Sequence, residues 1–279
     1  MSERELNYIE KQPRFNIEKR MGPKQNEVSF SPERGGIITS LKLKDKEILY
    51  LDMDTFNDNL KNVKGGVPIL FPNAGPLTEG PYPLEQHGFA RDANWTTIES
   101  APNEFITELK SDESTKEIFP FNFKTQTKTV LEEDGSASIY RETTNLETDK
   151  DMPLSEGLHP YFPVPENEKK NIKFDFPGGD VVESEIEKWT SGTPIKAIKI
   201  DNPKVSNPEV DLNVTIPGLG TLVFDFSPEY KRIWVWSQEG KDFICIEPVM
   251  RDAGGLVSDP EFIKPQETFS SKVNIRLEN

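Results

Sequence analysis

Apolar and polar residues alternate with a period of two along most of the chain, from about Val28 to the C-terminus. Residues 121–130 alternate in this way, and the pattern resumes at 138–143 after a turn that contains Asp134-Gly135. Two extended runs separated by an Asp-Gly pair are typical of a β-hairpin. The sequence therefore predicts paired antiparallel strands in the middle of the chain.

Further strands are predicted at five apolar runs: 172–176, 222–226, 233–236, 243–246 and 273–277. The third and fourth runs flank Glu239-Gly240, which predicts a second hairpin. Helical spacing is weak, and its best candidate, residues 5–19, is interrupted by Pro13. Many short strands punctuated by 23 prolines and 18 glycines favour a sandwich or a larger multi-sheet all-β fold. We expect an N-terminal extension at residues 1–25 and a single domain at 26–279.

Composition excludes several partners. The 279 residues include 33 basic and 48 acidic side chains, so 33 − 48 gives a formal net charge of −15. An acidic chain is a poor match for nucleic acid or for an anionic membrane surface, because both attract Lys and Arg. No run approaches the roughly 20 apolar residues of a membrane span. The charged N-terminal segment resembles no signal peptide, and the one cysteine cannot form an internal disulfide, so we expect a cytoplasmic protein.

Three residues stand out as candidates for acid–base chemistry. His87 and His159 are the only histidines, and an unperturbed histidine pKa of roughly 6.5 suits proton transfer at cellular pH. His87 precedes a glycine, whereas His159 precedes a proline and two aromatic residues. Glu247 ends an apolar strand, where burial would raise the pKa of its carboxyl group. The alternatives are structural or surface histidines and a glutamate that points into solvent.

Other kinds of site find little support. Two histidines and one cysteine without H-x-x-x-H or C-x-x-C spacing leave few ligands for zinc, so we expect no metal. The Gly-Gly pairs at 65–66 and 254–255 lack the spacing of a nucleotide-binding loop. Ser155 has no G-x-S-x-G context. We therefore expect no cofactor.

Four segments together resemble the aldose 1-epimerase (galactose mutarotase-like) family. They are Lys64-Gly-Gly-Val-Pro-Ile-Leu-Phe-Pro-Asn-Ala-Gly75, His87-Gly-Phe-Ala-Arg-Asp92 followed by Trp95, Gly157-Leu-His-Pro-Tyr-Phe162 and Cys245-Ile-Glu-Pro248. The segments occur in the family's order, and the resemblance covers nearly the whole chain. It implies a single β-supersandwich domain that binds a sugar in an open cleft and interconverts its α and β anomers without a cofactor.

The resemblance also implies roles for individual residues. Glu247 would be the general base that takes the proton of the C1 hydroxyl, and His159 the general acid that protonates the ring oxygen. His87 would hydrogen-bond the sugar, with Arg91 beside it as a cationic donor. Asn73 offers a planar polar group for sugar recognition.

Two departures from the family pattern concern the substrate. Galactose mutarotases carry an arginine where this chain has Pro76, which weakens the case for galactose. Relatives that act on hexose 6-phosphates have an arginine immediately before Gly-Gly, where this chain has Lys64. Lysine still supplies a point charge for a phosphate but lacks the bidentate fork of arginine.

The leading hypothesis is a mutarotase for an aldohexose, acting as a monomer or a weak homodimer on a small sugar. The first alternative is a hexose-6-phosphate mutarotase, and the second is a non-catalytic sugar-binding or regulatory protein on the same scaffold. A glycosidase would need two carboxylates flanking the scissile bond, and only Glu247 stands out.

Overall fold

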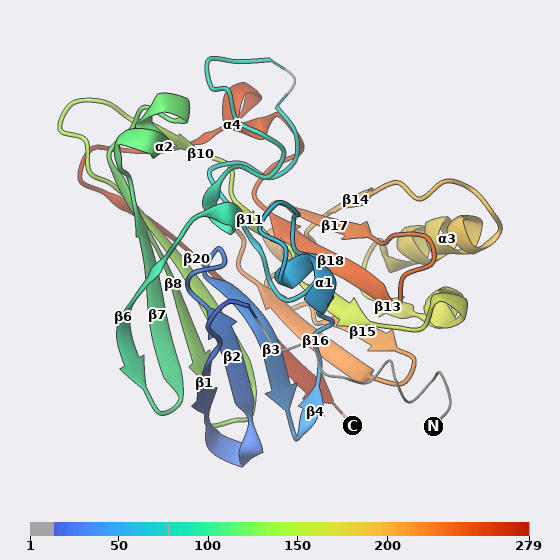
Figure 1. Ribbon diagram of the computed structural model, residues 1–279. Helices are drawn as coiled ribbons and strands as arrows, with labels where there is room; N and C mark the ends of the chain where they lie inside the picture. The colour runs from blue at the N-terminus through green and yellow to red at the C-terminus, as the bar shows by residue number, and fades with distance from the viewer. Residues whose placement is uncertain (1–13, 78, 279) are drawn as a thin grey trace.

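Antiparallel strands are the dominant secondary structure over residues 14–77 and 79–278, the part described by a computed structural model. The largest sheet has eight strands in the spatial order β13-β15-β16-β20-β9-β8-β7-β6 (Figure 1). In that order the strands are Lys173–Asp175, Leu212–Ile216, Gly220–Phe226, Thr268–Glu278, Ala137–Asn145, Phe123–Leu131, Glu104–Lys110 and Thr96–Ala101.

A second sheet has four strands joined in sequence order. They are β1 (Glu18–Met21), β2 (Glu27–Ser31), β3 (Ile37–Leu43) and β4 (Lys46–Glu47). β1 lies within the segment expected to be an extension and pairs along its whole length with β2. Residues 5–13 of the weak helical pattern lie outside the described residues, and the last two positions of that pattern belong to β1.

A third sheet has the order β14-β17-β18-β11-β5, and β12 also pairs with β18. Its strands are β14 (Ile198–Asp201), β17 (Arg232–Trp236), β18 (Phe243–Val249), β11 (Gly157–Leu158), β5 (Ile69–Leu70) and β12 (Tyr161–Pro163). A short two-stranded sheet joins β10 (Met152–Leu154) to β19 (Glu261–Ile263).

The eight-stranded sheet is the layer against which both other large sheets pack. Phe30 of β2 stacks on Phe105 of β7, with ring centroids 3.5 Å apart. Phe162 of β12 meets Phe224 of β16 at 5.4 Å. In Figure 1 the four-stranded sheet accordingly lies over the β6–β9 side of the large sheet. All four of these rings are buried, so the core lies between the layers.

The predicted hairpins are confirmed. β8 pairs with β9 from Phe123 to Leu131, and β17 pairs with β18. The predicted strands at 222–226 and 273–277 are confirmed as parts of β16 and β20. All-β architecture is therefore correctly predicted by the period-two pattern.

The sequence analysis missed a helix. Helix α3 spans Gly179–Thr190 and begins just after the short β13, where a strand end was expected. Val182, Ile186 and Trp189 are its buried side chains, spaced by four and three residues, as on one face of a helix. The remaining helices are short: α1 (Met53–Phe56), α2 (Glu113–Ile118), α4 (Gly255–Ser258), and the 3₁₀ turns Pro23–Gln25, Ala90–Asp92, Glu166–Asn171 and Pro203–Val205.

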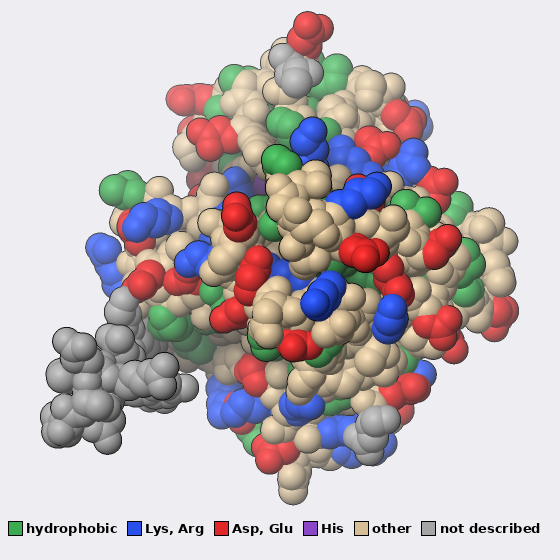
Figure 2. Space-filling model, turned by 90° about the vertical axis from the view of Figure 1, so that its right-hand side faces the viewer, with side chains coloured by type: hydrophobic (Ala, Val, Ile, Leu, Met, Phe, Trp, Pro, Cys, Tyr) green, Lys and Arg blue, Asp and Glu red, His purple; other side chains and the backbone are tan. Residues whose placement is uncertain are grey.

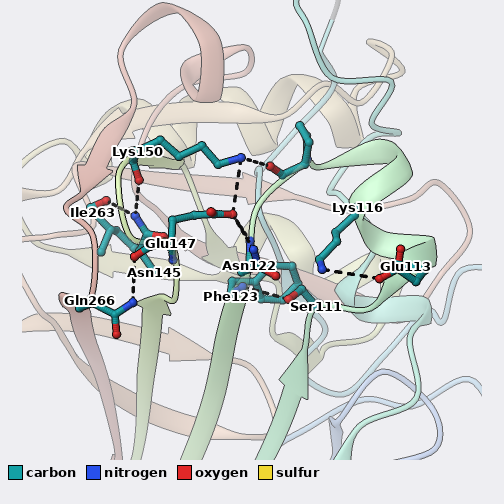
Figure 3. A network of polar contacts seen from close by, with 11 residues as sticks. Ser111, Glu113, Lys116, Asn122, Phe123, Asn145, Glu147, Lys150, Ile263 and Gln266 are labelled. Atoms are coloured by element: carbon teal, nitrogen blue, oxygen red, sulfur yellow. Dashed lines mark hydrogen bonds and ion pairs between the residues drawn. The ribbon is translucent and has the colours of Figure 1, made fainter.

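Polar contacts join one end of the large sheet to the β10–β19 pair (Figure 3). The Asn145 side chain, at the end of β9, donates to the carbonyl groups of Lys150 and Ile263. Glu147 accepts hydrogen bonds from the backbone and side-chain amides of Asn122. These contacts hold the chain just before β10, which leads into the segment that carries His159.

A buried ion pair lies between the sheets. Arg141 of β9 and Glu156, the residue before β11, are 0% and 1% exposed, and their side chains meet at 2.9 Å. Arg141 also donates to the hydroxyl groups of Thr125 and Thr127. The carbonyl of Glu156 accepts from the backbone amide of Met250. This pair therefore connects the large sheet to the segment just before His159, and through the Met250 amide to the segment just after Glu247.

Charged groups of both signs are interspersed on the molecular face shown in Figure 2, and apolar side chains there occur in small scattered groups. Within the described residues, no helix combines the length and the apolar character needed to cross a membrane.

Candidate active site

His159 and Glu247 lie opposite each other because of strand register. β12 pairs antiparallel with β18 so that Tyr161 faces Cys245, and β11 pairs with the same strand so that Gly157 faces Val249. The residue numbers of each pair sum to 406, and 159 + 247 gives the same sum. His159 Nε2 accordingly lies 3.3 Å from Glu247 Oε1. The two residues predicted as an acid–base pair are brought together.

Both side chains line a cavity of about 650 Å³. Their exposed fractions are small, 7% for His159 and 2% for Glu247. The residues that line the cavity are Asn62, Val63, Lys64, Pro76, Glu85, Gln86, His87, Arg91, His159, Tyr161, Ile195, Lys196, Ala197, Lys199, Trp234, Trp236, Glu247 and Ala253. Four cationic side chains thus face two carboxylates in a chain whose net charge is −15.

Aromatic rings fix the orientation of the pair. The His159 ring stacks on Tyr161, with centroids 4.8 Å apart and planes 12° apart. Trp236 meets the His159 ring edge-on at 6.1 Å. Trp234 and Trp236 are two residues apart on β17, so both face the cavity, and Trp234 is the register partner of Glu247.

His87 is held by a reciprocal pair of hydrogen bonds. Its backbone has a φ of 71°, in the left-handed region that non-glycine residues rarely occupy. The His87 amide donates to the carbonyl of Gly75, and the Gly75 amide donates to His87 Nδ1. Nδ1 is therefore an acceptor without a proton, and the neutral ring carries its hydrogen on Nε2. Burial, with help from Arg91 and Lys64, lowers the pKa of His87 to about 3.

The next residue explains the glycine of the His-Gly pair. Gly88 has a φ of 67°, and a Cβ at this position would lie 2.0 Å from the carbonyl oxygen of Phe71. Only glycine fits that approach. The close contact places the His87 ring 5.5 Å from the His159 ring.

Lys64 and Arg91 both line the cavity, as expected. Lys64 Nζ lies 5.0 Å from the centroid of the Trp236 ring. Arg91 donates to the carbonyl of Gln86 at 2.8 Å, and its Nε, which has no hydrogen-bond partner, lies 3.6 Å from the Asp92 carboxylate. Burial lowers the pKa of both side chains.

A main-chain ladder ties the Lys64 segment to the His159 segment. The amide of His159 donates to the carbonyl of Pro68, and the amide of Tyr161 donates to that of Gly66. The backbone amide of Tyr50 donates to the carbonyl of Tyr161, and the carbonyl of Tyr50 accepts from the amide of Gly66. The cation before Gly-Gly and the acid–base pair are therefore parts of one rigid unit.

Asn73 does not line the cavity. Its side chain is fully buried and donates to the backbone carbonyl groups of Gly75 and Glu85. The structure gives Asn73 a role in shaping the His87 loop, so the expected sugar contact is not included in the proposal below.

Arg251 lies at a second cavity of about 600 Å³, beside Asp201 and Arg232. Arg251 pairs there with Asp259 and Glu261, and Asp201 pairs with Arg232. Neither Arg251 nor Asp201 is among the residues that line the cavity with His159 and Glu247.

Among the cavity-lining residues that sequence reasoning missed are Lys196, Lys199, Trp234 and Trp236. Lys199 stacks over Trp234, with Nζ 4.4 Å from the ring centroid. Lys199 lies on the edge strand β14, opposite Trp234 in register. A lysine on an edge strand normally marks a solvated surface, so the sequence contained no signal that this one faces a cavity.

The electrostatics of the pair favour one shared proton. Burial raises the pKa of Glu247 well above its usual value. Burial, with the charges of His87, Lys64 and Arg91, lowers the pKa of His159 well below 6.5. A second proton is therefore bound only at low pH, and the shared proton is lost only at high pH.

We expect a bell-shaped pH profile of kcat/KM for any reaction that uses the pair. The acid limb comes from protonation of the pair a second time, and its midpoint lies well below 6.5 because the pKa of His159 is lowered. The alkaline limb comes from loss of the shared proton. Initial rates in constant-ionic-strength buffers measure both limbs, and an acid limb centred at or above 6.5 would contradict this assignment.

Comparison with known proteins agrees with this architecture. In three dimensions the chain resembles the Slr1438 protein from Synechocystis sp. PCC 6803, with a TM-score of 0.78 and 28% identity over 95% of this chain and 96% of that one. It also has the fold of a galactose mutarotase-like protein from Lactobacillus casei ATCC 334, with a TM-score of 0.71, 18% identity, and coverage of 94% and 100%. The fold is thus the galactose mutarotase-like all-β class.

The chain belongs to the aldose 1-epimerase family, whose model matches residues 21–276. A protein named putative glucose-6-phosphate 1-epimerase from Cenchrus ciliaris is 28% identical over 271 residues, 86% of this chain and 78% of that protein. The plasmid-encoded LacX protein of Lactococcus lactis subsp. lactis is 30% identical over 294 residues, 88% and 94% of the two chains. Family membership confirms the resemblance and makes this an epimerase-type, mutarotase-like protein.

Proposed function

We propose that the protein is an aldose 1-epimerase that interconverts the α and β anomers of an aldohexose or of its 6-phosphate. The observation that carries the proposal is the 3.3 Å contact between His159 and Glu247 at the wall of a cavity. The two oxygens of a hemiacetal share one carbon, so a pair at this spacing can reach both. A binding protein would need no such pair.

The reaction follows from the proton shared by the pair. The raised pKa of Glu247 and the lowered pKa of His159 favour the proton on Glu247 in the empty cavity, and the reactive form is the tautomer in which His159 carries this proton and Glu247 is ionised. Glu247 takes the C1 hydroxyl proton, C1 and its oxygen form the aldehyde double bond, the C1–O5 bond breaks, and His159 protonates O5. After rotation about C1–C2, the protonated Glu247 and the neutral His159 reverse the steps on the other face. One proton stays on the pair throughout, so no metal or cofactor is needed.

His87 and Arg91 support the sugar in this proposal. The neutral His87 ring carries its hydrogen on Nε2, because its Nδ1 accepts from the Gly75 amide; Nε2 lies 3.0 Å from the side-chain amide of Gln86, whose place a sugar oxygen would take. Arg91 is oriented by Gln86 and supplies a fixed positive charge beside it. Both donors stabilise negative charge that develops on the substrate oxygens.

The cavity favours a phosphorylated sugar as substrate. Lys64, Arg91, Lys196 and Lys199 line it, against only Glu85 and Glu247. Lys64 and Arg91 are partly buried and Lys196 and Lys199 are exposed, and a group of cations around one cavity attracts an anionic ligand and can bind phosphate through charge-assisted hydrogen bonds. The name of the Cenchrus ciliaris relative points in the same direction.

The direct test follows freshly dissolved α-glucose, α-galactose and α-glucose 6-phosphate by polarimetry or exchange NMR. We expect catalysed anomer exchange, fastest with the 6-phosphate. If none of the three exchanges faster than in buffer while a sugar still binds, the non-catalytic sugar-binding alternative takes the place of this proposal.

Replacing Lys64 tests the phosphate contact. We expect Lys64→Met to lower kcat/KM for glucose 6-phosphate by roughly 10- to 100-fold, the equivalent of one charge-assisted hydrogen bond of about 1.5–3 kcal/mol. The decrease with unphosphorylated glucose should be clearly smaller. Lys170→Met, which removes an exposed lysine outside the cavity, is the matched control. Equal losses with both sugars would assign Lys64 to the acid–base pair and not to the phosphate.

A further inference from the structure

A third donor group lies beside the acid–base pair. Cys245 is two residues before Glu247 on β18, so both side chains project from the same face of the strand. Its thiol is fully buried and packs with Tyr161 and Phe243. One ligand atom from each of His159, Cys245 and Glu247 lies within 4.8 Å of the others.

The geometry of the pair is that of two ligands of one metal ion. Zinc bonds of about 2.0–2.2 Å to nitrogen and oxygen place neighbouring ligand atoms of a tetrahedral site roughly 3.3–3.5 Å apart. His159 Nε2 and Glu247 Oε1 are already 3.3 Å apart. The Cys245 sulfur lies within 4.8 Å of the other two ligand atoms, and it completes a third corner after an approach of at most about 1.3 Å, given zinc–sulfur bonds of about 2.3 Å.

A second observation points to a ligand here. Glu247 Oε2 and His159 Nδ1 are buried and have no hydrogen-bond partner. Buried polar atoms without partners are rare and call for an explanation. Glu247 lines the cavity, so an ion entering from the cavity and bound at His159 Nε2 reaches the unpartnered Glu247 oxygen, whereas His159 Nδ1 lies on the other edge of the ring; a water molecule or a sugar hydroxyl can occupy the fourth corner.

We propose that His159, Cys245 and Glu247 form a binding site for zinc or a similar thiophilic divalent cation, and that the bound ion inhibits the protein by occupying the acid–base pair. Binding releases the thiol proton of Cys245 and the proton shared by His159 and Glu247. The thiolate and the carboxylate then balance the charge of the ion. This balance is needed because Lys64 lines the same cavity.

Composition makes the site unusually easy to test. The chain has one cysteine and two histidines in total, so any metal–thiolate signal must come from Cys245. Titration of the purified protein with Co²⁺, without sugar, should produce a near-ultraviolet thiolate-to-cobalt charge-transfer band, and Zn²⁺ should remove that band by displacement. Cys245→Ser and Cys245→Ala should lack the band, with thermal melting showing that each is folded.

The inhibition experiment rests on the proposed function, whereas the cobalt band does not. We expect Zn²⁺ to inhibit anomer exchange, a chelator to restore it, and Mg²⁺, which prefers oxygen ligands, to have no effect. Neither Cys245 variant removes a group of the proposed mechanism, so both should keep their turnover. Their zinc sensitivity should fall by at least the roughly 10- to 100-fold that loss of an outer-shell partner costs.

Two results would overturn the proposal. One is the absence of a charge-transfer band in the folded protein at saturating Co²⁺. The other is a folded Cys245→Ser variant that remains as sensitive to zinc as the unaltered chain. A protein that shows the band but no anomer exchange would keep the metal site and refute the epimerase function.

Discussion

Glu247→Gln should lower kcat for anomer exchange by on the order of 10² to 10⁴, the usual contribution of one positioned general base. Glutamine keeps the size of the side chain and its contact with His159, but cannot take a proton. Because Glu247 is 2% exposed and burial opposes its charge, the neutral substitute should not destabilise the fold. Stopped-flow polarimetry on glucose 6-phosphate and a thermal melt measure the two quantities.

The control must separate chemistry from binding. Glu85→Gln removes the other carboxylate of the cavity and should leave kcat within a few-fold of the unaltered chain. Glu247→Gln should still bind the sugar, so a lower kcat with little change in KM is expected. If Glu247→Gln retains most of its turnover, the base is a different group and the proposed mechanism is wrong.

Glu156→Gln should reduce the free energy of unfolding by about 3–5 kcal/mol, the range for breaking a buried ion pair by removing one partner. The substitution leaves the Arg141 guanidinium fully buried without its carboxylate. Urea denaturation followed by fluorescence measures the change. Some loss of turnover is also expected, since Glu156 lies three residues before His159.

An exposed pair provides the comparison. Lys188 and Glu185 form an ion pair on the surface of α3, and Glu185→Gln should cost less than about 1 kcal/mol. The double variant Arg141→Met, Glu156→Gln should lose less stability than the sum of its single variants, because neither partner then remains charged and unpaired. Additive losses, or a Glu156→Gln cost similar to that of Glu185→Gln, would mean that the buried pair is not coupled as its geometry implies.

Local pattern accounts for most of the fold. The β8–β9 hairpin could be predicted because its alternation and its Asp-Gly turn lie within 25 residues of each other. Helix α3 is not predicted from the sequence, because its apolar positions follow Pro177-Gly178-Gly179, a segment typical of the end of a strand. The division of strands among three large sheets could not be deduced, since it depends on pairing between distant segments.

The site was only partly predictable. The family resemblance predicts His159 and Glu247 as an acid–base pair, but the sequence alone does not show the register of β11 and β12 on β18 that produces their contact. Sequence spacing predicts no metal ligand at Cys245, because its neighbour His159 comes from a distant segment and only Glu247 lies on the same strand. Asn73 was expected to contact the sugar for its residue type alone, whereas it bonds to the backbone of its own loop.

The ladder that joins the Lys64 segment to the His159 segment means that the pocket is already ordered before a sugar binds. Its hydrogen bonds set the spacing between Lys64 and the His159–Glu247 pair when the chain folds. Such preorganisation spares the ligand the entropic penalty of ordering the pocket. Crystals grown with and without a sugar phosphate should therefore superpose along this ladder within about 1 Å, the usual shift for rigid recognition, with no gating motion to limit turnover.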